Sequence, residues 1–360
     1  MNPVVTVVVP AYNAEQTIIR TLASIQAQTI GDLDIRVVDD GSEDATGQII
    51  GSLQAQDPRI IGLRQENSGV ATARNTGMAG ALGRFVAFCD ADDIWHPQKL
   101  ERQLAALATD PAAGLCYPWY RRIDMQDRVL PGSPAPLVEG RVLHRHLEWN
   151  FISNGSSVLV QTPLAQRTGF EPGLRSAGNQ GCEDYLFQLQ IAQASRFVCV
   201  PAFLVGYRIS TQSMSRGVDR MIRSHLQTYE IMEKRLPPDR ALLRILSRRR
   251  AKLLIELFRN RLRRSDPRGA AKAFAGAVRA APDLVPRFLL EELREASARA
   301  RRTVPAADTD RFPPLRHFQD FGAEERDGPW HPRRSADYME WLAKLDMAQL
   351  SEGAEPGQYA

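Results

Sequence analysis

Residues 84–93 read RFVAFCDADD, an apolar run of strand character that ends in three carboxylates within four positions. So much negative charge at the end of a buried strand needs a physical reason, because a carboxylate loses its hydration when it is buried. Two interpretations are open on these residues alone. Either the acids face water and cap the following helix, or they hold a cation for another molecule.

Length and composition indicate one large globular domain with an appendage. The chain has 360 residues and a formal net charge of +4. Its 4 cysteines lack CxxC spacing, and those in apolar runs predict buried, reduced thiols of a cytosolic protein rather than disulfides or structural zinc. The N-terminus lacks the basic and long apolar regions of a signal peptide, and no window approaches about 18 uninterrupted apolar residues. We therefore expect neither a signal peptide nor a membrane span.

Apolar strands alternate with helical patterns in the first third of the chain. Strands are predicted at 4–10, 34–40 and 84–90, and helices at 14–28, 45–55 and 70–82. This alternation is typical of a mostly parallel sheet with helices on both faces. Ligands of such sheets bind outside the carboxyl ends of the strands, where this sequence places AYN, DDGS and DADD. The three polar strand ends should converge on one crevice.

The middle of the chain is less regular. Residues 114–215 contain short strand-like runs at 156–161 and 196–201 and a helical segment that begins near Cys182. Two histidines in this part, His144 and His146, are expected in a surface turn rather than in a metal site.

From Val218 onward the pattern is helical, and arginines crowd residues 240–264. A short helix is also expected near 336–350. The arginine-rich region is open to three interpretations: an appendage with solvated arginines, a surface that contacts an anionic membrane, or a nucleic-acid site. It lacks interleaved aromatic residues, so no nucleic-acid partner is expected.

The acidic run has a specific chemical use. Asp90 and Asp92 project from the same side of an extended chain, about 7 Å apart, and repel each other unless a cation lies between them. Mn²⁺ or Mg²⁺ takes one or two carboxylates together with water and phosphate oxygens, which suits a diphosphate ligand. Asp93 stands before a helix expected to begin at Pro97, so we expect its carboxylate to cap that helix.

Four segments strengthen this interpretation by their order. They are VVVPAYNAEQTIIRTLASI, VVDDGSEDAT, ENSGVATARNTGMAGALGRFVAFCDADD and CEDYLFQL. In this order and spacing they resemble family 2 glycosyltransferases of the GT-A fold, over about residues 4–215. The resemblance implies a Rossmann-like, mostly parallel sheet between helices, followed here by a C-terminal helical extension. It also implies inverting transfer of a sugar from a nucleotide diphosphate sugar, with Mn or Mg as the divalent cation.

The resemblance implies roles for individual residues as well. PAYN would surround the base and ribose, DDGS would contact the nucleoside, and the helix after Gly69 would bring an arginine to the diphosphate. The metal would be held chiefly by Asp92, with Asp90 near the ribose or reaching the metal through water. The substrate-binding positions implied in this way are Pro10, Ala11, Tyr12, Asn13, Glu15, Asp39, Asp40, Arg74 and Asp90. Without the family, PAYN and DDGS also fit ordinary turns and helix caps.

The acidic motif at 183–184 is the counterpart of the family's acceptor-side acids. An inverting transfer needs a base that takes the proton of the acceptor hydroxyl. The resemblance assigns this role to Asp184, with Glu183 as its neighbour or substitute; an acidic helix start is the alternative. Many relatives carry a histidine two residues beyond the arginine that matches Arg208. This chain has Ser210 there, a poor substitute for an imidazole ligand.

We therefore expect a nucleotide-sugar-binding half at 1–115, an acceptor-binding half at 116–218, an arginine-rich helical extension at 219–302 and a tail at 303–360. The expected acceptor is a glycan or a lipid-linked molecule in surface polysaccharide synthesis. The expected location is the cytoplasm, with peripheral contact of 240–264 at the inner membrane face. The rival functions are a sugar-phosphate nucleotidyltransferase, against which the absence of a glycine-rich basic loop in PAYNAEQT speaks, and a non-catalytic nucleotide-sugar-binding relative.

Overall fold

The computed structural model describes residues 3–176, 178–179, 181–209, 217–290, 316–327 and 336–348. The chain divides into two compact units. The first comprises Met1–Arg175, Glu183–Thr211 and Arg316–Ala360, and the second comprises Ser176–Cys182 and Gln212–Leu315.

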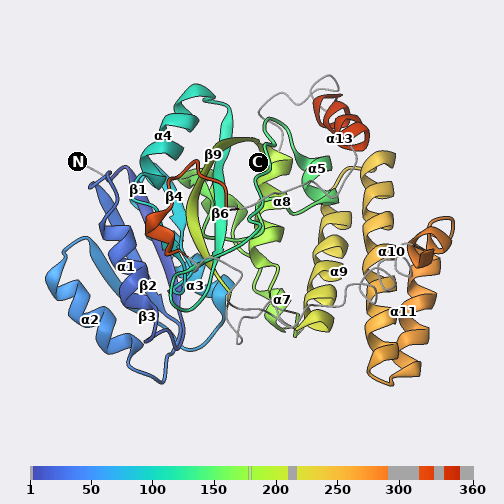
Figure 1. Cartoon of the computed structure of the whole chain (residues 1–360), viewed down its shortest axis with the longest axis horizontal. Helices are drawn as coiled ribbons and strands as arrows, with labels where there is room; N and C mark the ends of the chain where they lie inside the picture. Colours follow the sequence, from blue (N-terminus) through green and yellow to red (C-terminus); the bar gives the residue numbers. More distant parts are fainter. Residues whose placement is uncertain are drawn as a thin grey trace. The chain divides into compact units, whose positions relative to one another are not determined.

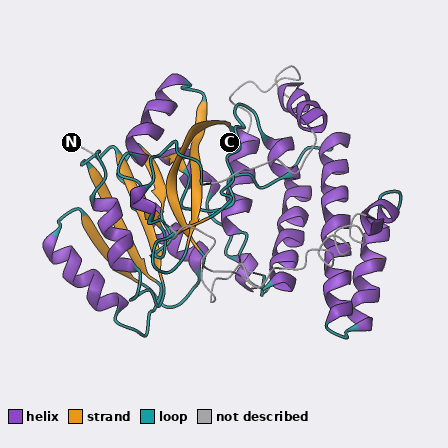
Figure 2. Cartoon of the chain, viewed as in Figure 1, coloured by secondary structure: helices purple, strands orange, loops and turns teal. Residues whose placement is uncertain are grey.

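A twisted sheet is the centre of the first unit, and Figures 1 and 2 show its strands side by side. Its N-terminal part has the order β3-β2-β1-β4, and all neighbours in it are parallel. These strands are β1 (Val5–Ala11), β2 (Leu33–Asp39), β3 (Ile60–Arg64) and β4 (Phe85–Phe88). The predicted strands at 4–10, 34–40 and 84–90 are confirmed. The short β3 was not predicted.

Helices cover both faces of these parallel strands. They are α1 (Ile18–Gln26), α2 (Thr46–Gln56) and α3 (Val70–Ala79), which confirms the three predicted helices; α1 and α3 are shorter than predicted, and α2 is shifted by one residue. Val5, Val7 and Val9 belong to the core cluster that also contains residues of α1 and α2. Val8 points the other way, since a side chain added at Gly77 of α3 would lie 2.5 Å from it. Successive strand residues alternate between the faces, so every residue of β1 is buried.

The second part of the sheet is mixed. It continues from β4 through β8 (Leu159–Gln161), β6 (Ala113–Ile123), β9 (Arg196–Arg208) and β5 (Ile94–Trp95), while β7 (Val129–Leu130) pairs with β6. β6 and β9 are parallel, and the other pairs in this part are antiparallel. The sequence did not reveal β6, because Pro118 interrupts its apolar run. The structure accommodates that proline next to a shift in the β6–β9 register.

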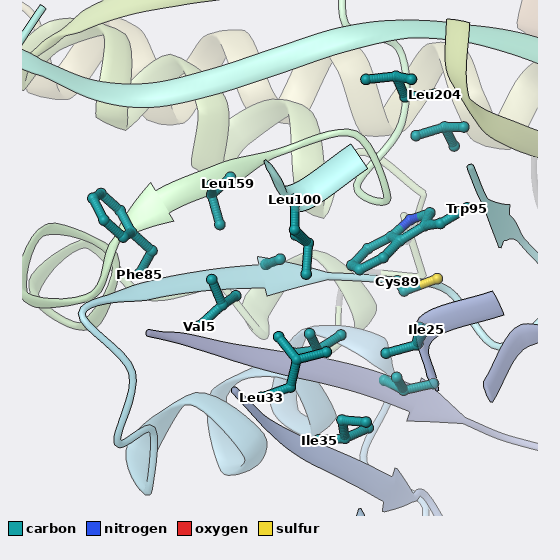
Figure 3. Close-up of a cluster of buried hydrophobic side chains, with 14 of the residues drawn as sticks. Val5, Ile25, Leu33, Ile35, Phe85, Cys89, Trp95, Leu100, Leu159 and Leu204 are labelled. Carbon is teal, nitrogen blue, oxygen red and sulfur yellow. The ribbon is translucent and has the colours of Figure 1, made fainter. Parts of the chain in front are cut away.

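One core cluster joins strands that are far apart in sequence (Figure 3). Val5, Leu33 and Phe85 from three parallel strands meet Leu159 of β8 and Leu204 of β9. Leu100 of α4 (Lys99–Thr109) belongs to the same cluster. The acidic turn after β4 is therefore attached to a continuous core rather than to a flexible loop.

The four cysteines are buried as free thiols, as expected for Cys89, Cys116, Cys182 and Cys199.

The helix expected near 336–350 is present as α13 (Ala336–Ala348), and it packs on α5 (Leu143–Glu148). Asp346 of α13 is fully buried and accepts hydrogen bonds from the backbone N–H and the Nδ1 of His144, at 2.7 and 3.0 Å, and from Arg145 Nε at 2.6 Å. It supplies the carboxylate that the N-terminus of α5 lacks in its own sequence. His144 and His146 are consequently buried in a helix, so the predicted surface turn is wrong.

Residues 316–327 also belong to the first unit. The backbone N–H of Val129 donates to Arg316 O, and that of Phe203 donates to Ala323 O. The buried Arg121 lies between the rings of Phe203 and Phe321, with its guanidinium carbon 4.6 Å from each centroid. A segment near the C-terminus thus completes the edge of the sheet.

The first unit also contains α6 (Thr162–Thr168), α8 (Glu183–Ala194) and the 3₁₀ turn η3 (Phe318–Asp320), and the short α7 (Gly173–Ser176) lies at its boundary.

From Val218 onward the described part of the second unit is mainly helical, as predicted. Its longer helices are α9 (Val218–Arg235), α10 (Arg240–Arg263) and α11 (Pro267–Ala280). Asp239 caps α10 by accepting from Ala241 N and Leu242 N. Several arginines of α10 are engaged: Arg250 pairs with Glu233, and Arg261 with Asp219 and Asp266. Across the described ranges, no helix combines the length and apolar character needed to cross a membrane.

Candidate active site

The carboxyl ends of β1, β2 and β4 meet because these strands are neighbours in the sheet. The loops that follow β1 and β2 are bonded to each other. Asn13 donates its N–H to Ser42 Oγ at 3.0 Å and accepts from Glu43 N at 2.9 Å, and Glu15 accepts from Ala45 N at 3.0 Å. Asn13 has a φ of 49° and joins two loops, whereas the N-cap of α1 is Thr17.

The predicted nucleoside residues lie together at this edge. Pro10 and Ala11 end β1, and Tyr12 follows with 48% of its surface exposed. Tyr12 is therefore an aromatic face available to a ligand at the edge where the strand ends converge.

Both acids of DDGS are buried and organise the backbone around them. Asp39 accepts from Ser42 N at 2.8 Å and pairs with Arg64. Asp40 accepts from Ser68 N at 2.8 Å and from Gly69 N at 2.7 Å, which holds the start of α3. Gly41 has a φ of 76°, and a side chain there would collide with Asn67. The two carboxylates therefore hold the loops at this edge of the sheet, in addition to any contact with a ligand.

The acidic run after β4 forms a turn, closed by the hydrogen bond from Asp93 N to Asp90 O at 3.0 Å. The N–H of Asp90 donates to Ser156 Oγ at 2.9 Å. Burial and repulsion from Asp90 raise the pKa of Asp92, and Arg208 opposes this shift. No described side chain donates a hydrogen bond to the Asp92 carboxylate, so its oxygens are available to a cation.

The capping role expected for Asp93 is wrong. Asp93 is fully buried and accepts from Ser156 Oγ at 2.5 Å and from Arg208 N at 2.8 Å. β5 follows it directly, and α4 begins only at Lys99, with Gln98 as its N-cap. The strand intervenes because Ile94 and Trp95 pair with β9, which moves the helix start away from the acids.

The second acidic motif opens α8. Glu183 is 4% exposed, and Asp184 lies in the same first turn. Burial raises the pKa of Asp184 to about 7, although Arg74 favours its charged form; the charges of Glu183 and Asp90 add to the increase. A carboxyl group with this pKa can accept and release a proton near neutral pH.

Arg74 connects the two acidic motifs. Its Nη2 pairs with Asp90 Oδ1 at 2.5 Å, and the charges of Asp184 and Glu183 also act on it. The side chain is 4% exposed, with its guanidinium carbon 5.2 Å from the centroid of Phe170. A Cβ added at Gly155 would lie 2.9 Å from Arg74 Nη2 and 3.6 Å from Asp184 Cβ. Asp90 and Asp184 therefore both lie near Arg74, which packs closely against Gly155.

The sequence did not indicate that Gly155 and Ser156 belong to this site. It also did not indicate that Arg208 holds the acidic turn. The one available signal was an arginine that ends an apolar strand in FLVGYR, where a buried charge needs a partner. Among the described residues, no three His, Cys, Asp or Glu side chains are grouped as a metal-ligand set. Ser210 lies outside the described residues.

Comparisons with known proteins find similarity to glycosyltransferases. The model of the family described as "Glycosyl transferase family 2" matches residues 6–166. Glycosyltransferase GlyA of Streptococcus pneumoniae is 31% identical over 219 residues, which are 59% of this chain and 31% of GlyA. The Escherichia coli protein WfgD, named as a UDP-Glc:alpha-D-GlcNAc-diphosphoundecaprenol beta-1,3-glucosyltransferase, is 42% identical over 104 residues, 29% of this chain and 40% of WfgD. Matches to such relatives span between 19% and 41% of the relatives' own lengths.

Solved structures agree in fold. S. aureus TarS 1–349 in complex with UDP-GlcNAc superposes with a TM-score of 0.60 at 18% identity, over 79% of this chain and 83% of that one. The mannosyltransferase PcManGT of Pyrobaculum calidifontis, in complex with GDP-Man and Mn²⁺, gives 0.55 at 22% identity, over 83% and 81%. The predicted GT-A-type α/β fold is confirmed.

Proposed function

We propose that this chain, whose residues 6–166 match the model of glycosyltransferase family 2, transfers a sugar from a nucleotide diphosphate sugar to a hydroxyl group. One observation carries the proposal. Arg74 pairs with Asp90, which follows β4, and lies in the field of Asp184, which opens α8. A donor-side acid and an acceptor-side acid therefore lie near one buried arginine, and a reaction between two substrates requires such proximity of the groups that bind them.

In this proposal Asp184 is the base. The acceptor oxygen attacks the anomeric carbon, the bond from that carbon to the diphosphate oxygen breaks, and the hydroxyl proton passes to Asp184. A single displacement inverts the anomeric configuration. Glu183 stays beside Asp184 and, by its charge, helps to keep the pKa of Asp184 high enough to take the proton. A product with retained configuration would contradict this mechanism.

The donor would lie against the edge formed by β1, β2 and β4. Tyr12 would stack on the base, and Asp39, Asp40 and the loop from Asn13 to Glu15 would border the nucleoside. Arg74 would face the diphosphate, because a planar and permanently charged guanidinium suits phosphate oxygens. We assign residues 1–115 to the donor half and 116–218 to the acceptor half on this basis.

The turn residues fit a divalent cation. The Asp92 carboxylate receives no hydrogen bond from a described side chain, and burial disfavours its charge unless a cation is near. Asp90 is the second oxygen donor, shared with Arg74. Mn²⁺ or Mg²⁺, when bound, would offset the charge that develops on the departing nucleoside diphosphate. Substitution Asp92→Ala should weaken Mn²⁺-dependent nucleotide binding, measured by calorimetry, and unchanged binding would remove Asp92 from this role.

The experiment that tests the function is a thermal-shift panel of nucleotide sugars, each with and without Mn²⁺. UDP-GlcNAc, UDP-Glc and GDP-Man come first, because TarS and PcManGT are structures with such donors and the name of WfgD specifies UDP-Glc. A shift with one donor, followed by slow Mn²⁺-dependent hydrolysis of that donor, supports a live transferase. Binding without hydrolysis would favour a non-catalytic relative.

The acceptor is proposed to be a glycan or a lipid-linked sugar of surface polysaccharide synthesis. WfgD is named for a diphosphoundecaprenol-linked acceptor, and TuaG of Bacillus subtilis for teichuronic acid biosynthesis. A membrane-linked acceptor would suit peripheral binding at the cytoplasmic membrane face through 240–264, where Arg244, Lys252, Arg263 and Arg264 are exposed. Flotation with anionic liposomes tests this part. Protein that stays at the bottom of the gradient would exclude it.

A further inference from the structure

The acidic turn is held from behind by Arg208, which the proposed mechanism does not use. Arg208 ends β9 and is 1% exposed. Its Nε donates to the main-chain oxygen of Asp92 at 2.6 Å, and its backbone N–H donates to Asp93 Oδ1 at 2.8 Å. One residue thus holds the backbone of Asp92 and the side chain of Asp93, although it lies more than 100 positions away in the sequence.

Arg208 is in turn held by Asp127. Its Nη2 pairs with Asp127 Oδ1, and its Nη1 donates to Asp124 O. Asp127 is 5% exposed and has a φ of 62°, a left-handed conformation that aspartate tolerates better than most residues. Its other oxygen, Oδ2, lies 3.1 Å from Arg20 Nη1 and 3.6 Å from His317 Nε2. Within the described part of the chain, three basic side chains therefore face this one carboxylate.

The C-terminal segment completes the surroundings of Asp127. The backbone N–H of Phe318 donates to Asp127 O at 2.8 Å. The Phe318 side chain packs in a small cluster with Ile94, Ile123 and Val129. Ile94 directly follows Asp93. Phe318 therefore contacts both the residue after the acidic turn and Asp127, which pairs with Arg208. It lies outside residues 6–166, which the family model matches.

We propose that Asp127 is a positioning residue of the transferase: through Arg208 it fixes the turn Asp90–Asp93 in the geometry that receives the donor's metal and diphosphate, and residues 316–325 complete this support. The role of the turn rests on the proposed function. The physical reason is orientation. The guanidinium of Arg208 is planar, so the ion pair with Asp127 at one end fixes the direction in which the other end donates to Asp92 O. Asp127 touches neither substrate nor reacting atoms.

Hydrogen exchange of the full chain tests the positioning without any need for activity. The variant is Asp127→Asn, which keeps the shape and removes the charge. The matched control is Asp57→Asn, since Asp57 is also buried and ion-paired, to Arg59, but lies at the end of α2. We expect amides of residues 89–96 to exchange about tenfold faster in the first variant and at the wild-type rate in the control. Equal protection of 89–96 in wild type and Asp127→Asn would overturn the proposal.

Manganese binding, followed by electron paramagnetic resonance of Mn²⁺ with UDP, is the second readout. Loss of a residue that orients metal ligands costs about 10- to 100-fold in metal affinity, so Asp127→Asn should weaken Mn²⁺ binding in this range. Saturating Mn²⁺ should restore donor hydrolysis in the variant, which a general loss of folding would not allow. If the wild type binds Mn²⁺ and Asp127→Asn binds it with the same affinity, the proposal is also overturned.

The outcomes separate the two proposals. Faster exchange at 89–96 in a protein that binds no nucleotide sugar would sustain the positioning role and contradict the transferase. If Asp127→Asn fails to fold, Arg20→Gln decides, because it removes one donor from the same carboxylate and Arg20 is 38% exposed. About threefold faster exchange at 89–96 is then expected, and no change would refute the role of Asp127.

Discussion

The pH dependence of the reaction is the sharpest test of Asp184. Burial raises its pKa to about 7, and a general base acts only in its ionised form. Ionisation then increases from about one molecule in eleven at pH 6 to about ten in eleven at pH 8, so kcat/KM should rise about tenfold over this interval. The assay is release of nucleoside diphosphate from the identified donor, at fixed saturating Mn²⁺.

Variants of Arg74 provide a second, independent test of Asp184. Its positive charge favours the ionised form of Asp184, so its removal in Arg74→Met should move the midpoint of the profile to higher pH. Arg74→Lys keeps a charge and should keep the midpoint closer to that of the wild type. Both variants should also raise the KM for the donor, because Arg74 is proposed to face the diphosphate, but a change in KM alone does not move the midpoint. A flat profile between pH 6 and 8, or the same midpoint in Arg74→Met, would refute the assignment of Asp184.

Three further predictions concern single residues. Asp184→Asn should lower the transfer rate by about 10²–10⁴ while nucleotide binding measured by calorimetry persists; full turnover would remove Asp184 from the role of base. Asp346→Ala should lower the free energy of unfolding in urea by on the order of 3 kcal/mol, because Arg145 and the start of α5 lose their buried partner, whereas Asp337→Ala on the exposed first turn of α13 should have little effect. Equal effects of the two would argue against the docking of α13. Burial lowers the pKa of Lys99 from 10.5 to about 7, so between these values the unfolded chain binds a proton that the folded protein lacks, and the contribution of Lys99 to the free energy of unfolding should rise with pH. Lys99→Met should abolish this rise and Lys344→Met, at an exposed position, should keep it; a rise that persists in Lys99→Met would contradict the burial of an uncharged amine.

Much of the first unit follows from local patterns. The β-branched runs at β1 and β2 and the spacing of Ile18, Leu22 and Ile25 in α1 specify period 2 and period 3.6, which depend only on neighbours in the chain. The order of the motifs led to the family and to the fold. Strand ends that are polar in three parallel neighbours were enough to expect one crevice.

Other features depend on contacts between residues that are distant in sequence. Asp93 looked like a cap because it precedes a helical pattern, but its carboxylate is used by Ser156 and Arg208. His144 was expected in a surface turn, but the structure buries it against Asp346, which lies 202 positions later in the sequence. The strand β6 was not predicted because Pro118 interrupts its apolar run. In the structure, the register between β6 and β9 shifts next to this proline.

The sequence by itself determined three of the four strands in the parallel half of the sheet, the helices on its two faces and the acids that end those three strands, since these are set by periodicity and by residue type. Tertiary structure alone decided which acids are free for a ligand and which are used by the fold. The physical reason is that a carboxylate's charge, partners and pKa depend on what surrounds it in space. For Asp92 and Asp93, adjacent in RFVAFCDADD, those surroundings differ. No described side chain donates a hydrogen bond to the Asp92 carboxylate, whereas both oxygens of Asp93 accept hydrogen bonds, from Ser156 and Arg208.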